Sequence, residues 1–445
     1  MRRLVLMLGF VVATLSLSAQ EQKGEVLVLS LEQALDIALS ENPTIKVADQ
    51  EIEIKRYAKQ GVYASLYPQI DATVTYQRVI QKQTMSMSLG GQAQTIKVGS
   101  DNTFNGGLTV GMPIINAQLW TRLKISALDV ELAVEKARSS RIDMVEQVTT
   151  AYYTTLLAKE SRDLYKRVYD NAVENNSIVK KKFDVGAVSE YDMITSNVAV
   201  QNAIPNVIEA ENSVVLALWQ LKALLGIDLE KNIDIVGTLT DYESVVTRGY
   251  QITQLDLSNN STLKQLDIQE QQLEKAVKLT KMANVPTLLV NAAYLYTALG
   301  NDGQFFYSKA WNPYSYAGLS LNIPIFAGNA KRAATREKRL SLENLKLMRE
   351  DTERLLRVSV VQYLNNMETS VKKYYSSSAN VGQAQRGYDI AVKRYEVGRG
   401  TLVDIDNSQL ALTQAELNRN MSIFDFLTAK VSLDKVLGNY EESKK

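Results

Sequence analysis

The sequence predicts a mainly α-helical protein with a small transmembrane β part, and three observations predict it. Two runs of about 67 residues, 118–184 and 329–397, contain no proline, and only the second contains glycine, so each can form one long helix. Four short segments alternate apolar and polar residues, as transmembrane strands do. The second half of the chain also repeats the pattern of the first.

The repeat appears in three blocks that keep a nearly constant offset. The matching blocks are 39–46 with 257–264, 107–114 with 318–325, and 183–186 with 395–398, at offsets of 218, 211 and 212. We interpret this as a tandem duplication, with a first repeat over 21–237 and a second over 238–445.

The strands are expected at about 69–77, 104–112, 287–296 and 315–323. Alternation alone would also fit a half-buried soluble sheet. In a membrane, four strands cannot close a barrel, because the smallest membrane barrels use about eight. An open sheet edge in lipid costs several kcal/mol for each unpaired backbone group. A membrane sheet of this size must therefore be completed by further copies of the chain.

The remaining segments predict helices that double back on the two long ones. Return helices are expected at 189–225 and 401–437, and shorter helices at 43–67 and 261–285. Within each half, the short helix and the return helix could pack end to end beside the long helix. A continuous long helix would measure about 100 Å, which places both Val-Gly turns about that far from the strands.

Composition excludes several classes of function. The chain has no histidine and no cysteine, which removes the commonest general base, the Ser-His and Cys-His pairs, disulfides and most zinc sites. Fifty basic residues balance 49 acidic ones, so nucleic acid is not expected as a partner. No cofactor, metal or enzymatic activity is expected. Residues 1–20, with Arg2, Arg3 and an apolar stretch, have the pattern of a signal peptide.

These features resemble the TolC-like outer-membrane efflux proteins. The resemblance is carried by the duplicated Leu-Ser-x-Asn blocks, the proline-flanked strands and a Val-Gly-x(5)-Asp element at 185–192 and 397–404. It covers nearly the whole chain after residue 20. It implies a homotrimer in which three sets of four strands form one 12-stranded β-barrel in outer-membrane lipid. The duplicated helix hairpins would form an α-helical barrel in the periplasm.

The resemblance also implies a function and partners. The channel would passively conduct substrates from a periplasmic adaptor, and through it an inner-membrane transporter, to the exterior. Efflux and type I protein secretion both stay open. The residues that match the adaptor-docking tips are Val185, Gly186, Val397 and Gly398.

A gate at the periplasmic entrance is implied as well. The residues that match it are Asp192, Tyr395, Asp404 and Asn407. Threefold symmetry would gather six aspartates there, and such charged rings bias conduction towards cations. The sequence departs from the best-known gate because Asn407 replaces a second aspartate. Gly400 replaces an arginine, with Arg399 beside it.

Each of these residues also has a purely local interpretation. The two turn glycines can simply end long helices with a positive φ. Ser189 with Asp192, and Thr401 with Asp404, fit an ordinary helix capping box. Lys180, Lys181 and Lys182 are interpreted as a solvated face with favourable charge near a helix C-terminus.

Smaller expectations concern the strand ends. Residues 78–103 and 298–313, Pro313 included, are expected to be surface loops. An aromatic cluster is expected to form an interfacial girdle; its members are Tyr294, Tyr296, Tyr307, Trp311, Tyr314 and Tyr316. The alternative to a channel is a periplasmic coiled-coil scaffold or adaptor without a pore. An adaptor should carry a β-rich insertion between its helices, and residues 185–189 leave no room for one.

Overall fold

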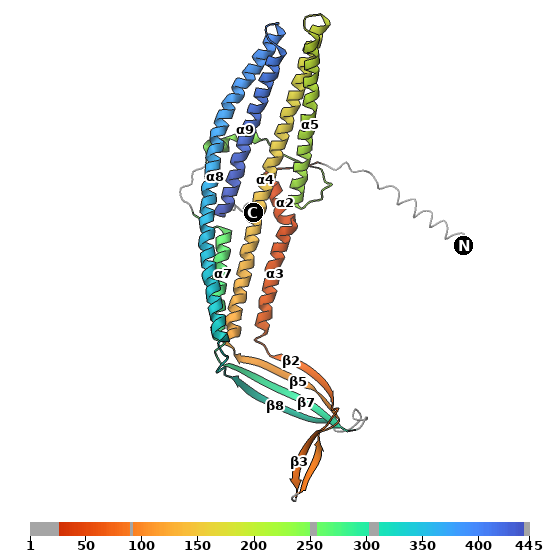
Figure 1. Cartoon of the computed structure of the whole chain (residues 1–445), viewed down its shortest axis with the longest axis vertical. Helices are drawn as coiled ribbons and strands as arrows, with labels where there is room; N and C mark the ends of the chain where they lie inside the picture. The colour runs from red at the N-terminus through yellow and green to blue at the C-terminus, as the bar shows by residue number, and fades with distance from the viewer. Residues whose placement is uncertain (1–25, 90–91, 250–255, 302–310, 440–445) are drawn as a thin grey trace, which may run out of the picture. The chain divides into compact units, whose positions relative to one another are not determined.

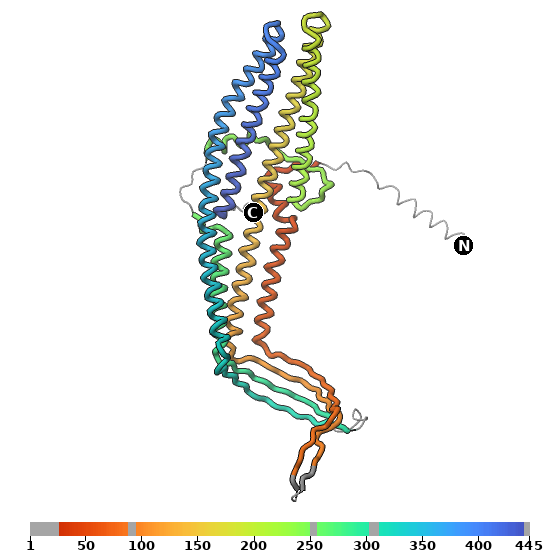
Figure 2. The backbone as a smooth tube through the Cα atoms, in the orientation of Figure 1, coloured from red at the N-terminus to blue at the C-terminus, as the bar shows by residue number. Residues whose placement is uncertain are grey.

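A computed structural model describes residues 26–89, 92–249, 256–301 and 311–439 (Figure 1). The expected signal peptide, residues 1–20, lies outside them. The chain forms two compact units: residues 1–48, 137–261 and 353–445 belong to the first, and residues 49–136 and 262–352 to the second. Each unit therefore takes segments from both halves of the sequence, as the tube in Figure 2 lets the reader follow.

The second unit contains a four-stranded antiparallel sheet. Its strands are β2 (Gln69–Arg78), β5 (Asn102–Ile115), β7 (Thr287–Gly300) and β8 (Trp311–Asn322). They lie in the order β2-β5-β7-β8, so β2 and β8 are the edge strands. All four expected strands are present at the expected positions.

The register of this sheet collects the apolar side chains on one face. One row across the strands consists of Ile70, Val110, Ala292 and Ala317. The next row, which points to the opposite face, consists of Asp71, Thr109, Ala293 and Tyr316. Because side chains alternate along each strand, the apolar and polar rows also alternate. The apolar rows together form one face that extends across all four strands.

Three expectations about the strand ends are wrong. Residues 78–103 are not only a loop, because β3 (Gln83–Leu89) and β4 (Gln92–Val98) pair as an antiparallel hairpin within them. Pro313 lies in β8, opposite Tyr296. A proline is tolerated there because β8 is an edge strand.

The expected aromatic girdle is the third error, since its members occupy two faces. Tyr294, Tyr296 and Trp311 share the apolar face, whereas Tyr314 and Tyr316 lie on the opposite one. Tyr307 lies outside the described residues. On the apolar face, the Phe104 ring packs edge-on against Trp311, with ring centres 5.5 Å apart.

Each long run forms a single helix, as predicted. They are α4 (Ala117–Asp184), with 68 residues, and α8 (Ala330–Glu396), with 67, and both contribute residues to both units. The other helices of more than ten residues are α2 (Leu31–Glu41), α3 (Pro43–Ala64), α5 (Glu190–Leu225), α7 (Ser261–Met282) and α9 (Leu402–Leu437). In the described part of the chain, no helix is long and apolar enough to cross a membrane.

In each half, the short helix meets the end of the return helix, as predicted: α3 meets α5, and α7 meets α9. The two junctions are made by equivalent asparagine hydrogen bonds. Buried Asn42, which precedes α3, donates a 2.7 Å hydrogen bond from Nδ2 to the carbonyl of Leu224, near the end of α5. Buried Asn260, which precedes α7, donates a 2.7 Å bond to the carbonyl of Val436 in α9. These bonds satisfy carbonyls that the last turn of a helix leaves unpaired.

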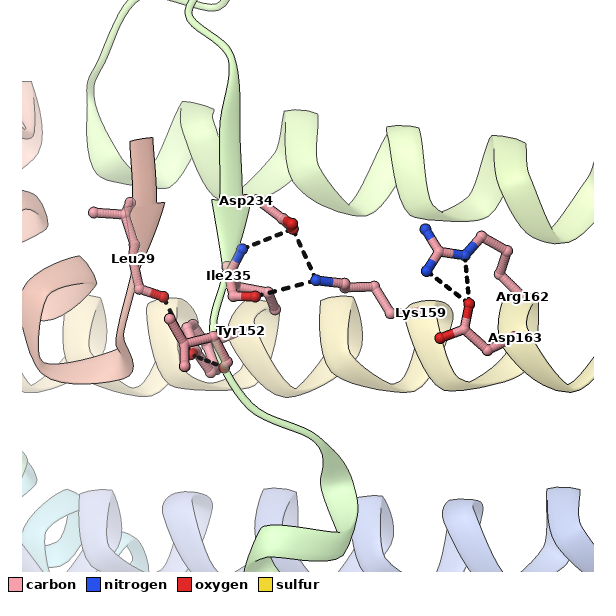
Figure 3. Close-up of polar contacts among 8 residues, drawn as sticks. Leu29, Tyr152, Lys159, Arg162, Asp163, Asp234 and Ile235 are labelled. Atoms are coloured by element: carbon pink, nitrogen blue, oxygen red, sulfur yellow. Dashed lines mark hydrogen bonds and ion pairs between the residues drawn. The ribbon is translucent and has the colours of Figure 1, made fainter. Parts of the chain in front are cut away.

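A small parallel sheet was not expected. It pairs β1 (Leu27–Leu29) with β6 (Ile233–Ile235), and a 3-10 turn, η1 (Leu239–Tyr242), and α6 (Glu243–Arg248) follow it. Side chains of α4 hold these strands. The Tyr152 hydroxyl donates to the carbonyl of Val236 at 2.6 Å. The Lys159 ammonium lies 2.8 Å from the carboxylate of Asp234, as Figure 3 shows. Burial raises the pKa of Tyr152 to about 12, so this hydroxyl remains a donor.

Candidate functional site

The turn between α4 and α5 is built by a glycine. Gly186 has a φ of +72°, and its amide donates to the carbonyl of Phe183 at 2.8 Å. The amide of Ala187 donates to the carbonyl of Lys182 at 2.8 Å. These two bonds form a Schellman motif, which requires a positive φ and therefore favours glycine. Val185, beside the glycine, is 78% exposed.

The turn between α8 and α9 repeats this arrangement. Gly398 has a φ of +73° and donates to the carbonyl of Tyr395 at 3.1 Å, while Arg399 donates to the carbonyl of Arg394 at 2.8 Å. Val397 is 70% exposed. The local interpretation of both glycines as helix ends is confirmed, and each turn presents one open valine.

Both aspartates of the candidate gate serve as helix caps. The amide of Ser189 donates to Asp192 Oδ2 at 3.2 Å, and the amide of Asp192 donates back to the Ser189 hydroxyl at 3.2 Å. Thr401 and Asp404 make the same pair of bonds, at 2.9 and 3.2 Å. The capping boxes are therefore confirmed. The backbone and hydroxyl hydrogen bonds from Thr401 hold the pKa of Asp404 below its usual range, and the positive charge of Arg394 adds to this.

Tyr395 lies in a small apolar cluster below the turns. It is 6% exposed and shares the cluster with Val179 of α4, Leu402 and Ile405 of α9, and Ala391 of α8. Its hydroxyl is buried and has no hydrogen-bond partner among the described residues. Burial, and then the negative charge of Asp192, raises the pKa of Tyr395. Met193, the residue after Asp192, packs against the same cluster, so the start of α5 lies beside Tyr395.

Lys182 connects the two turns, and the sequence did not predict this connection. Its ammonium donates to the carbonyls of Tyr395 and, at 3.0 Å, Glu396, the last residue of α8. It also lies 4.4 Å from the centre of the Tyr395 ring, within cation–π range. The expected favourable charge near a helix C-terminus is confirmed for α4, whose last turn contains Lys181 and Lys182, and Lys182 contributes the same charge to the end of α8.

The remaining candidate positions are open or tightly packed. Asn407 is exposed on α9. At Gly400, an added Cβ would lie 3.1 Å from both the Tyr395 amide nitrogen and the Arg394 Cβ. An arginine at position 400 would thus crowd the last turn of α8, and Arg394 is the cation whose charge acts on Asp404. Within the described ranges, no cluster of three or more Asp and Glu residues could hold a metal ion.

The fold and these turns together define a class of protein. In the described part of the chain, a sheet with one apolar face and two unpaired edges occurs together with helix hairpins that end in matching turns, and this combination defines a subunit of an outer-membrane channel. Comparison with solved structures gives the same fold: the CmeC outer membrane channel of Campylobacter jejuni superposes with a TM-score of 0.72, at 18% identity over 96% of this chain and 92% of CmeC.

Sequence comparison gives the family. The outer membrane efflux protein family matches residues 34–227 and again 252–439, and the chain belongs to this family. The alkaline protease secretion protein AprF of Pseudomonas aeruginosa is 23% identical over 435 residues, covering 95% of this chain and 87% of AprF. The probable efflux pump outer membrane protein TtgC of Pseudomonas putida is 24% identical over 449 residues, covering 93% of this chain and 84% of TtgC. The chain is therefore an outer-membrane exit channel.

Proposed function

We propose that three copies of this chain form one 12-stranded β-barrel that continues into a tunnel of helix hairpins. The supporting observation is the sheet, whose apolar face spans all four strands, while within the described residues neither β2 nor β8 pairs along its outer edge. Pairing β8 of one copy with β2 of the next would satisfy both edges and close the ring.

The absence of cysteine makes the closure directly testable. A variant with one cysteine on β2 and one on β8 should give dimers and trimers with a short thiol crosslinker in outer-membrane fractions. A control with its cysteines on the central strands β5 and β7 should crosslink only within one chain. A β2–β8 variant that stays monomeric would disprove the proposed barrel.

We also propose that the two turns dock a periplasmic adaptor, through which an inner-membrane transporter delivers cargo. Val185 and Val397 expose apolar side chains at tight turns, and such surfaces suit a partner protein. A photo-crosslinking residue at position 397 should capture the adaptor. The same residue at position 361, an exposed valine within α8, should not. Capture at both positions would argue against specific docking.

The gate is the third part of the proposal. Asp192, Tyr395, Asp404 and Asn407 would line the narrow periplasmic mouth of the trimer, with the carboxylates biasing it towards cations. In planar bilayers, Asp404→Ala should lower cation selectivity or raise conductance. Because Asp404 is also a cap, Thr401→Ala is the control: it weakens the same capping box but keeps the charge. Equal traces for wild type and Asp404→Ala would contradict the gate.

A further inference from the structure

The polar face of the four-stranded sheet carries an unusual set of side chains. Among the residues of β2, β5, β7 and β8 on this face, Asp71 is the one charged residue. Most of the others are threonine, asparagine, glutamine, serine or glycine. Against this neutral background, β8 places two aromatic rings, Tyr314 and Tyr316.

These two tyrosines are open to solvent and stacked on one another. Tyr314 is 52% exposed and Tyr316 47%, and their ring centres lie 6.2 Å apart with 23° between the planes. Neither hydroxyl has a hydrogen bond within the described structure. They lie opposite Leu295 and Ala293 of β7, which carry aliphatic side chains.

A second tyrosine pair on the other face provides a contrast. Tyr294 and Tyr296 lie on the apolar face, meet edge to face, and join their hydroxyls by a 2.9 Å hydrogen bond. An interfacial role in lipid explains tyrosines on that face. It does not explain Tyr314 and Tyr316, which point away from the apolar face.

Closure of the barrel would place this pair and the Asp71 carboxylate on the same inner wall, and this step rests on the trimer proposed above. The apolar face would contact lipid, so the polar face would line the lumen. β8 of one copy would then neighbour β2 of the next, at the usual spacing of about 4.8 Å between strands. Within one chain, Tyr316 lies in the same cross-strand row as Asp71, through Ala293 and Thr109, and the closed ring would hold six tyrosines and three carboxylates.

We propose that Tyr314, Tyr316 and Asp71 form a contact station in the barrel lumen for cargo that carries positive charge beside a planar aromatic surface. The exposed rings offer stacking and cation–π contacts, and the carboxylates attract the charge. Cations without an aromatic surface would lose the stacking on the tyrosine rings. Aromatic anions would lose the attraction to the carboxylates.

Block of single-channel current in planar bilayers tests this station. Ethidium, a planar aromatic cation, is added on the β-barrel side and compared with tetraethylammonium and naphthalenesulfonate. Ethidium should block at a concentration at least tenfold lower than either. Tyr314→Leu/Tyr316→Leu should raise its half-blocking concentration about tenfold, and Asp71→Asn about threefold. Tyr294→Leu/Tyr296→Leu, on the opposite face, should leave it unchanged.

The outcomes separate this inference from the proposed channel. If wild type gives no channels, the channel proposal fails first. If channels form but ethidium blocks no better than tetraethylammonium, the station is disproved. If the Tyr314/Tyr316 leucine variant does not assemble, Tyr314→Phe/Tyr316→Phe decides, because the rings alone should preserve the block. Loss of block in that phenylalanine variant would overturn the assignment.

Discussion

The ammonium of Lys182, in the last turn of α4, lies 4.4 Å from the centre of the Tyr395 ring, in the last turn of α8. Lys182 also donates to two carbonyls at the end of α8. One side chain of the first hairpin therefore caps the helix end of the second, so the two turns behave as one structural element.

Lys182→Met should loosen this connection. Methionine keeps an unbranched side chain that is one atom shorter, but it removes the charge and both hydrogen bonds. Because Lys182 is partly exposed, we expect a loss of about 1 kcal/mol, or about a fivefold rise in local opening. Limited proteolysis of the detergent-solubilised protein at the turns measures this opening. Lys181→Met, at an exposed neighbouring residue, is the control and should not change the cleavage rate.

Tyr395→Phe separates a core role from a gate role. The hydroxyl is buried without a partner in the described structure, so its removal should leave the melting temperature unchanged or slightly raised. If the hydroxyl serves the proposed gate in the trimer, the same variant should raise single-channel conductance. Unchanged conductance would show that Tyr395 acts only in the apolar cluster.

The sequence predicts what depends on local pattern. The long helices follow from the lack of breakers, and the caps at Asp192 and Asp404 follow from spacing alone. The β3–β4 hairpin was missed because its polar, glycine-containing composition is typical of loops. The faces of Tyr314 and Tyr316 could have been predicted, since they alternate with Ala317 along β8 and a shift of one residue changes the face.

The contacts between the two helix hairpins could not be predicted from local sequence patterns. Lys182 lies 213 residues before Tyr395, and no periodicity in either helix reveals that they meet. Whether Asp192, Asp404 and Asn407 form a gate depends on neighbouring copies of the chain. A single chain therefore shows the capping bonds of the two aspartates and the exposure of Asn407, whereas a gate would form only where three chains meet.

The two C-terminal glycines of α8 and α9 should differ in their tolerance of alanine. Gly398 and Gly438 have φ values of +73° and +70°, so alanine costs about 1–2 kcal/mol at either position. At Gly398, an added Cβ meets nothing within 4 Å, whereas at Gly438 it lies 2.1 Å from the carbonyl oxygen of Asn259. Gly438→Ala should therefore cost about 1–3 kcal/mol more.

Thermal unfolding followed by circular dichroism ranks these variants. Gly382→Ala, within α8 and with open space around it, is the control and should slightly raise the melting temperature, because alanine favours a helix. Equal effects of Gly398→Ala and Gly438→Ala would contradict the close contact at Asn259.

The cap at Asp404 should give the turn a dependence on pH. Its pKa is lowered in the folded chain, so its stabilising contribution is present above the unfolded pKa of about 3.9 and is lost as pH falls through the folded value. A bimane label on Val397→Cys, the single cysteine in the chain, should report opening of the turn below about pH 4. Asp404→Asn should remove this transition, and its persistence there would assign it to another carboxyl.

The end-to-end helix junction predicts the opposite dependence on pH. Asn42 accepts a 2.7 Å bond from the amide of Thr44 and donates one to the carbonyl of Leu224. In Asn42→Asp, a buried carboxylate would keep the first bond but face that carbonyl without a proton to donate. Its folded pKa should be raised, so the variant should lose about 1–3 kcal/mol at neutral pH.

Because that pKa is raised, stability should return as pH falls towards the unfolded pKa of about 3.9, when the protonated carboxyl can donate again. Melting temperatures of Asn42→Asp at pH 5 and pH 8 should therefore differ more than those of Asn42→Ala, which lacks the titrating group. Asn260→Asp should behave in the same way, since Asn260 makes the equivalent bond to Val436. If Asn42→Asp and Asn42→Ala respond equally to pH, the Asn42 side chain does not donate to Leu224, and the helices must be joined there by packing alone.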